Sequence, residues 1–186
     1  MLVTGFGPFE DVEDNASGRV AERLRGARIA GHEVVAEVLP TIFGRATARV
    51  SELVREVSPR AVVALGVSRD PWPRLERRAA STVTSARPDV AGEVWLGRRL
   101  GSMDLENAGA RETWLAAARA VAPEARWSED CGGYVCNAVH HALLEASASG
   151  VPSLFVHIPR ASDPASIDHI GRLVGALIEV MVGEGA

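Results

Sequence analysis

Residues 61–66, Ala-Val-Val-Ala-Leu-Gly, form an uninterrupted apolar run that breaks at a glycine. An apolar run of this length without polar alternation is typical of a strand buried on both faces at the centre of a parallel sheet. Residues 153–158, Ser-Leu-Phe-Val-His-Ile, form a second such run, which Pro159 closes. These two segments predict a mainly parallel sheet that is covered by helices on both sides.

The rest of the chain alternates between strand and helix patterns. Strands are expected at residues 2–4 and 32–39, and residues 82–100 show mixed strand and loop character. Helices are expected at 46–57, from about 111 to the proline at 123, from about 132 to 148, and from 164 to 181, and the first begins near Asn15 or Ser17. This order predicts a three-layer α/β/α sandwich with a mainly parallel twisted sheet, in a single domain of residues 1–186.

The composition of the chain limits its partners, its compartment and the catalytic groups it can use. The chain has 186 residues, 47% hydrophobic and 24% charged, and a formal net charge of −4, which disfavours a nucleic-acid backbone as partner. No apolar run approaches the roughly 18 residues that span a membrane, and the amino terminus does not resemble a signal peptide. Two cysteines are too few for a disulfide scaffold, so the cytoplasm is the expected compartment. All 20 basic residues are arginine, which excludes a catalytic lysine, a Schiff base and a P-loop.

The most informative stretch for chemistry is Cys-Gly-Gly-Tyr-Val-Cys-Asn, residues 131–137. The two glycines permit a tight turn, and Cys136 falls in the first turn of the helix that follows. A thiol at a helix start experiences the positive end of the helix dipole, which favours the reactive thiolate, and the free backbone amides there can hold an oxyanion. Cys136 is therefore a candidate nucleophile, and the alternative is that it is a small buried apolar residue. Cys131 is expected to be a bystander.

His157 ends the second apolar run, at the carboxyl edge of the sheet where the Cys136 helix begins. A cysteine nucleophile needs a base in reach, and His157 is the candidate, with a core histidine as the alternative. His140 and His141 are expected at the surface or in packing. No histidines, cysteines and carboxylates stand at convincing zinc spacing, so we expect no metal.

Two further segments lie near the same edge. Glu76 follows the first apolar run and is the best placed acid to orient a histidine, although a carboxylate among arginines is usually part of a solvated ion-pair cluster. Phe6 and Phe9, in a loop after the first strand, are expected to wall an apolar pocket or to pack beneath the loop.

Taken together, these motifs resemble the pyroglutamyl peptidase I family of cysteine peptidases. The resemblance is carried, in order and over nearly the whole chain, by Thr-Gly-Phe-Gly-Pro-Phe (4–9), Asn15, Leu-Pro-Thr-Ile-Phe (39–43), Glu-Arg (76–77), Tyr-Val-Cys-Asn (134–137), Val-His-Ile-Pro (156–159) and Ser-Ile-Asp-His-Ile (166–170).

The resemblance implies hydrolysis of an amino-terminal pyroglutamyl residue from peptides, without a cofactor, by a triad of Cys136, His157 and Glu76. It implies an oxyanion hole formed by the Cys136 backbone N–H with Arg87. The residues at the family's substrate-binding positions are Phe6, Phe9, Asn15, Val67 and Tyr134. Members commonly form dimers or tetramers, so a homo-oligomer is expected.

One departure keeps other functions open. Val67 stands where the family has a substrate-contacting glutamine, and it cannot donate that hydrogen bond. A cysteine–histidine hydrolase or amidase for another small lactam or acyl group is therefore a second hypothesis. A non-catalytic small-molecule binding domain, in which Cys136 is structural, is a third.

Overall fold

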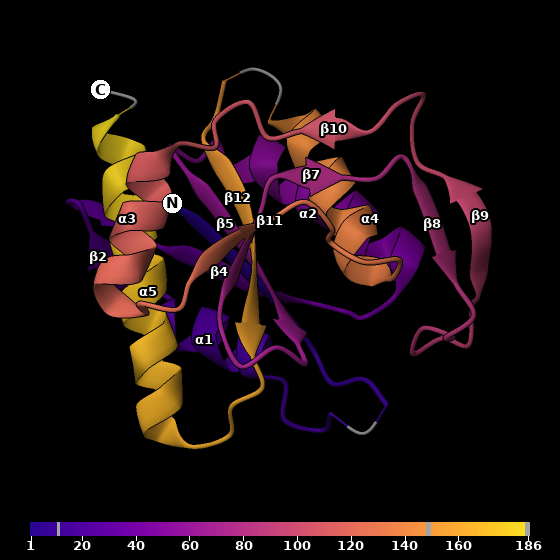
Figure 1. The fold of residues 1–186 in the computed structure, drawn as a ribbon, viewed down its shortest axis with the longest axis horizontal. Coiled ribbons are helices and arrows are strands. Elements are labelled where there is room, and N and C mark those ends of the chain that lie inside the picture. Colours follow the sequence, from indigo (N-terminus) through magenta and orange to yellow (C-terminus); the bar gives the residue numbers. More distant parts are fainter. Residues whose placement is uncertain (11, 148–149, 185–186) are drawn as a thin grey trace.

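The fold is built on a six-stranded central sheet (Figure 1). The structure is a computed structural model that describes residues 1–10, 12–147 and 150–184. In spatial order the sheet strands are β11 (Arg126–Ser128), β6 (Arg74–Glu76), β12 (Ser153–Pro159), β5 (Val62–Ser68), β1 (Leu2–Phe6) and β4 (Val35–Leu39). The four strands from β12 to β4 are parallel to one another. Strand β6 pairs antiparallel to β12, and β11 pairs parallel to β6.

The central strands bury both faces because successive side chains enter different cores. Val63 and Leu65 pack into one core together with the apolar sides of α1, α3 and α5, and Val62 and Ala64 pack into the other with α2 and α4. The helices of the described residues are α1 (Ala16–Leu24), α2 (Phe43–Val57), α3 (Glu112–Val121), α4 (Val135–Ala146) and α5 (Pro164–Gly183). Helices on both faces of the sheet confirm the predicted α/β class (Figure 1).

Local signals set several helix ends. Asn15 caps α1, because its side chain accepts a hydrogen bond from the backbone N–H of Ser17. Asp163 caps α5 in the same way, and Pro164 follows it at the first helical position. Helix α2 ends where Ser58 takes a left-handed conformation, one residue before Pro59.

The remaining strands form small two-stranded units outside the central sheet. They are β2 (Arg28–Ile29) with β3 (His32–Glu33), β7 (Arg78–Ala79) with β10 (Leu105–Glu106), and β8 (Thr82–Ser85) with β9 (Trp95–Arg99). The β8–β9 hairpin extends away from the body of the molecule, beyond α4 (Figure 1). No helix among the described residues has the length and apolarity needed to cross a membrane.

The structure corrects several boundaries predicted from the sequence. The expected strand at 32–39 is interrupted at Val34, so that its two parts belong to different sheets. Gly66 does not end the central strand, because β5 continues through it to Ser68 in register with β12. Helix α2 begins at Phe43, three residues earlier than expected. The predicted end of the 132–148 helix, at Ala148, lies outside the described residues.

Candidate active site

Cys136 stands in the first turn of α4, at the end of a glycine turn. Gly132 has a φ of +81°, which residues with a side chain rarely adopt, and a Cβ on Gly133 would lie 2.5 Å from the carbonyl oxygen of Thr84. The two glycines therefore allow the tight approach that the sequence suggested. No side chain caps this helix, so its first backbone amides are available to an incoming oxyanion.

His157 reaches the same place from β12. It pairs in register with Gly66 on β5 and with Arg74 on β6, so three neighbouring strands meet at the level of its ring. A Cβ on Gly66 would lie 2.9 Å from the Cys136 sulfur, which shows that the thiol rests directly against this strand. The Cys136 and His157 side chains interact with each other at this point.

Glu76 is the third member of a row of side chains that runs from Cys136 through His157 to Glu76. Its Oε1 atom lies 2.7 Å from His157 Nδ1, and the Glu76 side chain is fully buried. The Nε atom of Arg74 lies 3.4 Å from the same carboxylate oxygen. Because the carboxylate accepts the hydrogen of Nδ1, the opposite ring nitrogen, Nε2, is the one left for proton transfer.

The electrostatics of the site favour a positive charge on His157. Burial alone lowers the pKa of this ring, but the Cys136 sulfur and then the Glu76 carboxylate outweigh burial and raise the pKa to about 9. The ring is therefore protonated at neutral pH. A cationic imidazolium and a helix amino terminus both favour a thiolate beside them.

Cys131 also lies in this cluster, although sequence analysis treated it as a bystander. Its sulfur, a His157 ring nitrogen and a Glu76 oxygen all lie within 4.8 Å of one another. Burial raises the pKa of the Cys131 thiol well above its usual value, and the negative charge of Glu76 raises it further. The Cys131 thiol is therefore uncharged at neutral pH. Such a trio resembles a metal-ligand set, but Glu76 Oε1 is already engaged by His157.

A cavity of about 250 Å³ opens beside Cys136 and His157. It brings together all the substrate-binding positions predicted from the sequence, which are Phe6, Phe9, Asn15, Val67 and Tyr134, as well as Arg87. The ring centroids of Phe9 and Tyr134 are 6.3 Å apart and form one aromatic wall. Glu76 lies behind His157 and does not line the cavity.

Two of these residues also have structural roles that the sequence did not reveal. The Nδ2 atom of Asn15 donates to the carbonyl oxygen of Gly7 at 2.8 Å and so fixes the loop that carries the phenylalanines. The Nε atom of Arg87 lies 2.9 Å from Glu10 Oε1, and its guanidinium carbon is 5.0 Å from the centre of the Tyr134 ring.

His140 and His141 are both buried within α4, so the surface position considered for them is wrong and the packing alternative holds. His140 lies against Phe155, with 5.6 Å between ring centroids, on the core side of the site. The periodicity of α4 gave no signal of their burial, because at about 100° per residue His140 and His141 lie away from the face that carries Val135 and Val139.

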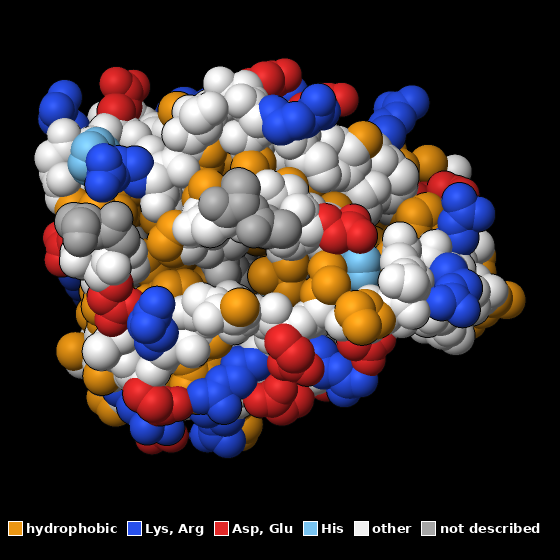
Figure 2. All heavy atoms as spheres, turned by 90° about the horizontal axis from the view of Figure 1, so that it is seen from above, with side chains coloured by type: hydrophobic (Ala, Val, Ile, Leu, Met, Phe, Trp, Pro, Cys, Tyr) orange, Lys and Arg blue, Asp and Glu red, His pale blue; other side chains and the backbone are white. Residues whose placement is uncertain are grey.

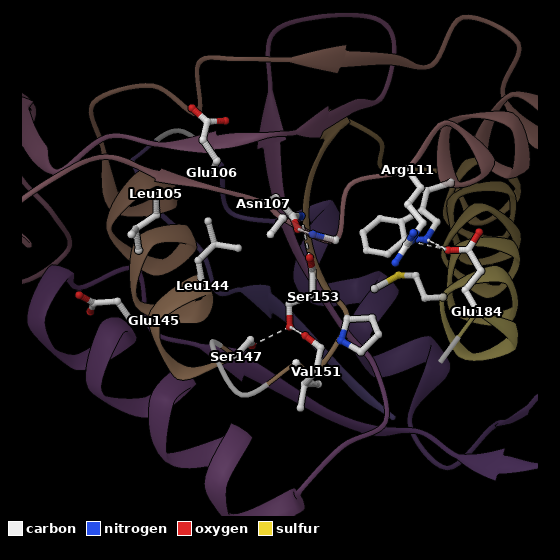
Figure 3. A pocket seen from close by; sticks show the side chains of 16 residues that line it. Leu105, Glu106, Asn107, Arg111, Leu144, Glu145, Ser147, Val151, Ser153 and Glu184 are labelled. Carbon is white, nitrogen blue, oxygen red and sulfur yellow. Dashed lines mark hydrogen bonds and ion pairs between the residues drawn. The ribbon is translucent and has the colours of Figure 1, made fainter. Parts of the chain in front are cut away.

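A larger cavity lies elsewhere, at the amino end of β12, with a volume of about 860 Å³ (Figure 3). Its polar groups bond to one another: Asn107 donates to the carbonyl oxygen of Ser153, and Arg111 pairs with Glu184. Figure 2 views the molecule from this end and shows acidic and basic side chains mixed around hydrophobic ones. Size alone therefore does not locate the chemistry, since the nucleophile and the histidine are at the other end of the sheet.

The fold and the cysteine–histidine–carboxylate row define a hydrolase of the cysteine peptidase class, and comparison with known proteins agrees. The sequence matches the pyroglutamyl peptidase family over residues 1–177. A pyrrolidone-carboxylate peptidase of Klebsiella pneumoniae is 31% identical over 171 residues, covering 86% of this chain and 77% of that protein. One from Gloeobacter violaceus is 33% identical over 177 residues, covering 89% and 83%. The chain belongs to the pyroglutamyl peptidase family.

Solved structures support the same assignment. A mutant pyrrolidone carboxyl peptidase from Pyrococcus furiosus matches with a TM-score of 0.89 and 25% identity, over 100% of this chain and 99% of that one. Another structure of the Pyrococcus furiosus protein matches with a TM-score of 0.91 at 24% identity. The central sheet and its flanking helices are thus those of the family.

Proposed function

We propose that this enzyme removes an amino-terminal pyroglutamyl residue from peptides, with Cys136 as nucleophile, His157 as general acid and base, and Glu76 as the group that orients His157. The observation that carries the proposal is the 2.7 Å contact between His157 and Glu76, in a row that continues to Cys136 at the start of α4. Family membership supplies the substrate class.

The first half of the reaction is acyl transfer to sulfur. The Cys136 thiolate attacks the carbonyl carbon that joins the pyroglutamyl group to the next residue, and negative charge develops on the carbonyl oxygen. The backbone N–H of Cys136 and the Arg87 guanidinium stabilise this oxyanion. The C–N bond then breaks, and the imidazolium of His157 gives its proton to the departing amine. A thioester between the pyroglutamyl group and Cys136 remains.

The second half is hydrolysis of the thioester. His157, now neutral, takes a proton from a water molecule as its oxygen attacks the thioester carbon. The C–S bond breaks, which releases pyroglutamic acid and returns the thiolate–imidazolium pair. Glu76 keeps the ring oriented and stabilises its positive charge in both halves.

The cavity beside Cys136 suits a small flat ring. Phe6, Phe9 and Tyr134 provide apolar and aromatic surface for the lactam, and Asn15 shapes the loop that carries the first two. Val67 offers no hydrogen bond, so substrate binding loses about 1 kcal/mol relative to a glutamine at this position. This loss lowers kcat/KM by about fivefold and leaves the chemistry intact.

The deciding experiment is hydrolysis of a fluorogenic L-pyroglutamyl amide under reducing conditions. We expect turnover by the native chain and by Cys131→Ala, and none by Cys136→Ala. The two cysteine variants form a matched pair, because each removes one sulfur from the same cluster. Turnover by Cys136→Ala at the native rate would overturn the assignment of the nucleophile.

Val67 favours a second candidate, a cysteine–histidine amidase for another small lactam or acyl group. A panel of acyl amides that differ only in the ring separates the two functions. An inert pyroglutamyl amide, together with rapid turnover of another acyl amide that still requires Cys136, would favour the second.

The proposal also covers the oligomeric state of the enzyme and its compartment in the cell. We propose a homo-oligomer, a dimer or a tetramer, in the cytoplasm, with no nucleic-acid or membrane partner. Sedimentation of the purified chain tests the first point, and cell fractionation tests the second. A monomer across the micromolar range would remove the oligomer from the proposal.

A further inference from the structure

The cavity beside Cys136 is unusually rich in positive charge for an acidic protein. Four arginines line it, and no Asp or Glu among the described residues does: Arg69, Arg74, Arg87 and Arg160. The chain as a whole has a formal net charge of −4. The far end of the molecule shows both signs of charge interspersed (Figure 2), in contrast to the lining of this cavity.

Two of the four arginines are committed to nearby carboxylates. Arg74 lies 3.2 Å from Asp70 Oδ2 and 3.4 Å from Glu76 Oε1, and Arg87 lies 2.9 Å from Glu10 Oε1. Their charges are thus largely balanced by the protein. Neither arginine accounts for an unmet positive charge at the cavity mouth.

Arg69 is different, because it is exposed and makes no ion pair with any residue in the described ranges. Its position follows from the sheet: β5 and β12 are paired in register as far as Ser68 and Pro159, and each strand leads into an arginine. Arg69 and Arg160 therefore leave adjacent parallel strands side by side, past the carboxyl edge of the sheet. Their side chains reach the same cavity.

The size of the cavity limits what enters it. A volume of about 250 Å³ falls below the roughly 300–1,000 Å³ of ordinary small-molecule sites. With the pyroglutamyl ring inside against the aromatic wall, the residue after the scissile bond lies at the mouth. Arg69 is exposed and lines the same cavity, so its side chain can pair with a carboxylate there.

We infer that the enzyme prefers substrates with a carboxylate on the residue that follows the pyroglutamyl group, and that Arg69 determines this specificity. The inference rests on the proposed function and adds a substrate class to it. The carboxylate is either an acidic side chain at that position or the carboxyl terminus of a pyroglutamyl dipeptide.

Three peptides distinguish these two sources. Pyroglutamyl-glutamic acid α-amide carries only the side-chain carboxylate, pyroglutamyl-glutamine carries only the terminal one, and pyroglutamyl-glutamine α-amide carries neither. Release of the second residue gives kcat/KM for each. We expect at least one carboxylate peptide to exceed the neutral amide by about fivefold, mainly through KM, which is the size of one exposed ion pair.

The matched variants are Arg69→Met and Arg60→Met. Arg60 is also exposed and precedes β5 at the opposite end of the same strand, so it controls for the loss of one surface charge. We expect Arg69→Met to abolish the preference and keep the activity on the neutral amide, whereas Arg60→Met keeps both. High salt should also reduce the preference of the native chain, because it screens exposed charges.

The outcomes separate this inference from the function on which it rests. Cleavage of all three peptides with equal kcat/KM overturns the inference and leaves pyroglutamyl peptidase activity in place. A preference that survives in Arg69→Met, or loss of activity on the neutral amide in that variant, overturns the role of Arg69. No cleavage of any peptide removes the proposed function, and the inference falls with it.

Discussion

At the level of single residues, the site depends on a charged side chain that is buried, that of Glu76. Glu76 is fully buried, yet it holds the His157 ring at 2.7 Å and contributes to raising the pKa of that ring. A buried carboxylate is costly without partners, and here His157 and Arg74 both contact its Oε1 atom. The arrangement keeps an imidazolium beside Cys136 at neutral pH.

Glu76→Gln keeps the shape of the side chain and removes its charge. We expect kcat on a pyroglutamyl amide to fall by about 100-fold or more, because the ring is no longer held and its cation no longer stabilised. The pKa of His157 should fall from about 9, since one of the charges that raises it is gone. The alkaline limb of the pH–rate profile should therefore move to lower pH. Glu112→Gln, at an exposed residue that pairs with Arg77, is the control, and an unmoved limb in Glu76→Gln would contradict the argument.

The two cysteines should differ sharply in reactivity. We expect iodoacetamide at pH 7 to modify Cys136 quickly, because it stands at a helix start beside a cationic ring, and Cys131 only after unfolding. Burial and the charge of Glu76 keep the Cys131 thiol protonated, with its pKa well above the usual value. Both cysteines lie in one tryptic peptide, residues 127–160, so tandem mass spectrometry that locates the label within this peptide over a time course measures both rates. Equal rates in the folded protein would refute the assignment.

The elements of the fold decide which side chains can meet. Strand β5 must come close to α4 where Cys136 begins the helix, and Gly66 is the residue that permits this approach. Strand β6 is only three residues long, Arg-Leu-Glu, and it enters the sheet antiparallel to β12. Its register opposite Phe155 and His157 brings Glu76 next to the histidine ring.

Gly66→Ala tests this approach of strand to helix. The added methyl group would lie 2.9 Å from the Cys136 sulfur and 3.0 Å from the Phe155 ring, so the thiol or the strand must shift. We expect kcat/KM to fall at least tenfold and Cys136 alkylation to slow, because displacement by a fraction of an ångström disturbs an attack geometry. Gly44→Ala in α2 is the matched control, since its added methyl meets nothing within 4 Å. Native kinetics in Gly66→Ala would show that the approach is not needed.

For the molecule as a whole, the buried polar residues set how stability depends on pH. His140 is fully buried, and neither of its ring nitrogens makes a hydrogen bond of ordinary geometry with a described residue. Burial, and after it the charges of His157 and His141, lower the pKa of His140 to about 3, although the nearby backbone of Arg78 acts in the opposite direction. The folded protein therefore keeps this ring neutral in mild acid.

His140→Phe should reduce the acid sensitivity of folding. Between about pH 6.5 and pH 3 the unfolded chain binds a proton at His140 and the folded chain does not, so the free energy of unfolding falls as pH falls. Replacing the ring with phenylalanine removes this contribution. Urea unfolding at pH 7, 6 and 5 should give a shallower decline for His140→Phe than for the native chain. His169→Phe, on the half-buried side of α5, provides the comparison, and identical declines in all three proteins would exclude the role of His140.

The sequence could predict what depends on neighbouring residues. Apolar runs at 61–66 and 153–158 specified the central strands, and the capping residue Asn15 and the first-turn proline Pro164 specified helix starts. Cys136 and His157 were placed at the carboxyl edge for the same reason, since each follows a local pattern that fixes where its element begins or ends. Family motifs then pointed to Glu76 and to the aromatic residues.

Only the tertiary structure decided which distant segments meet. The entry of β6 beside β12, the position of Cys131 against Glu76 and the full burial of His140 have no local signature, because strand pairing and helix docking join residues tens of positions apart. The adjacency of Arg69 and Arg160 likewise follows from the register of β5 with β12, which no periodicity encodes. Local sequence patterns therefore identified the candidate catalytic residues. Long-range packing determined how these residues are arranged and which charged side chains line the cavity.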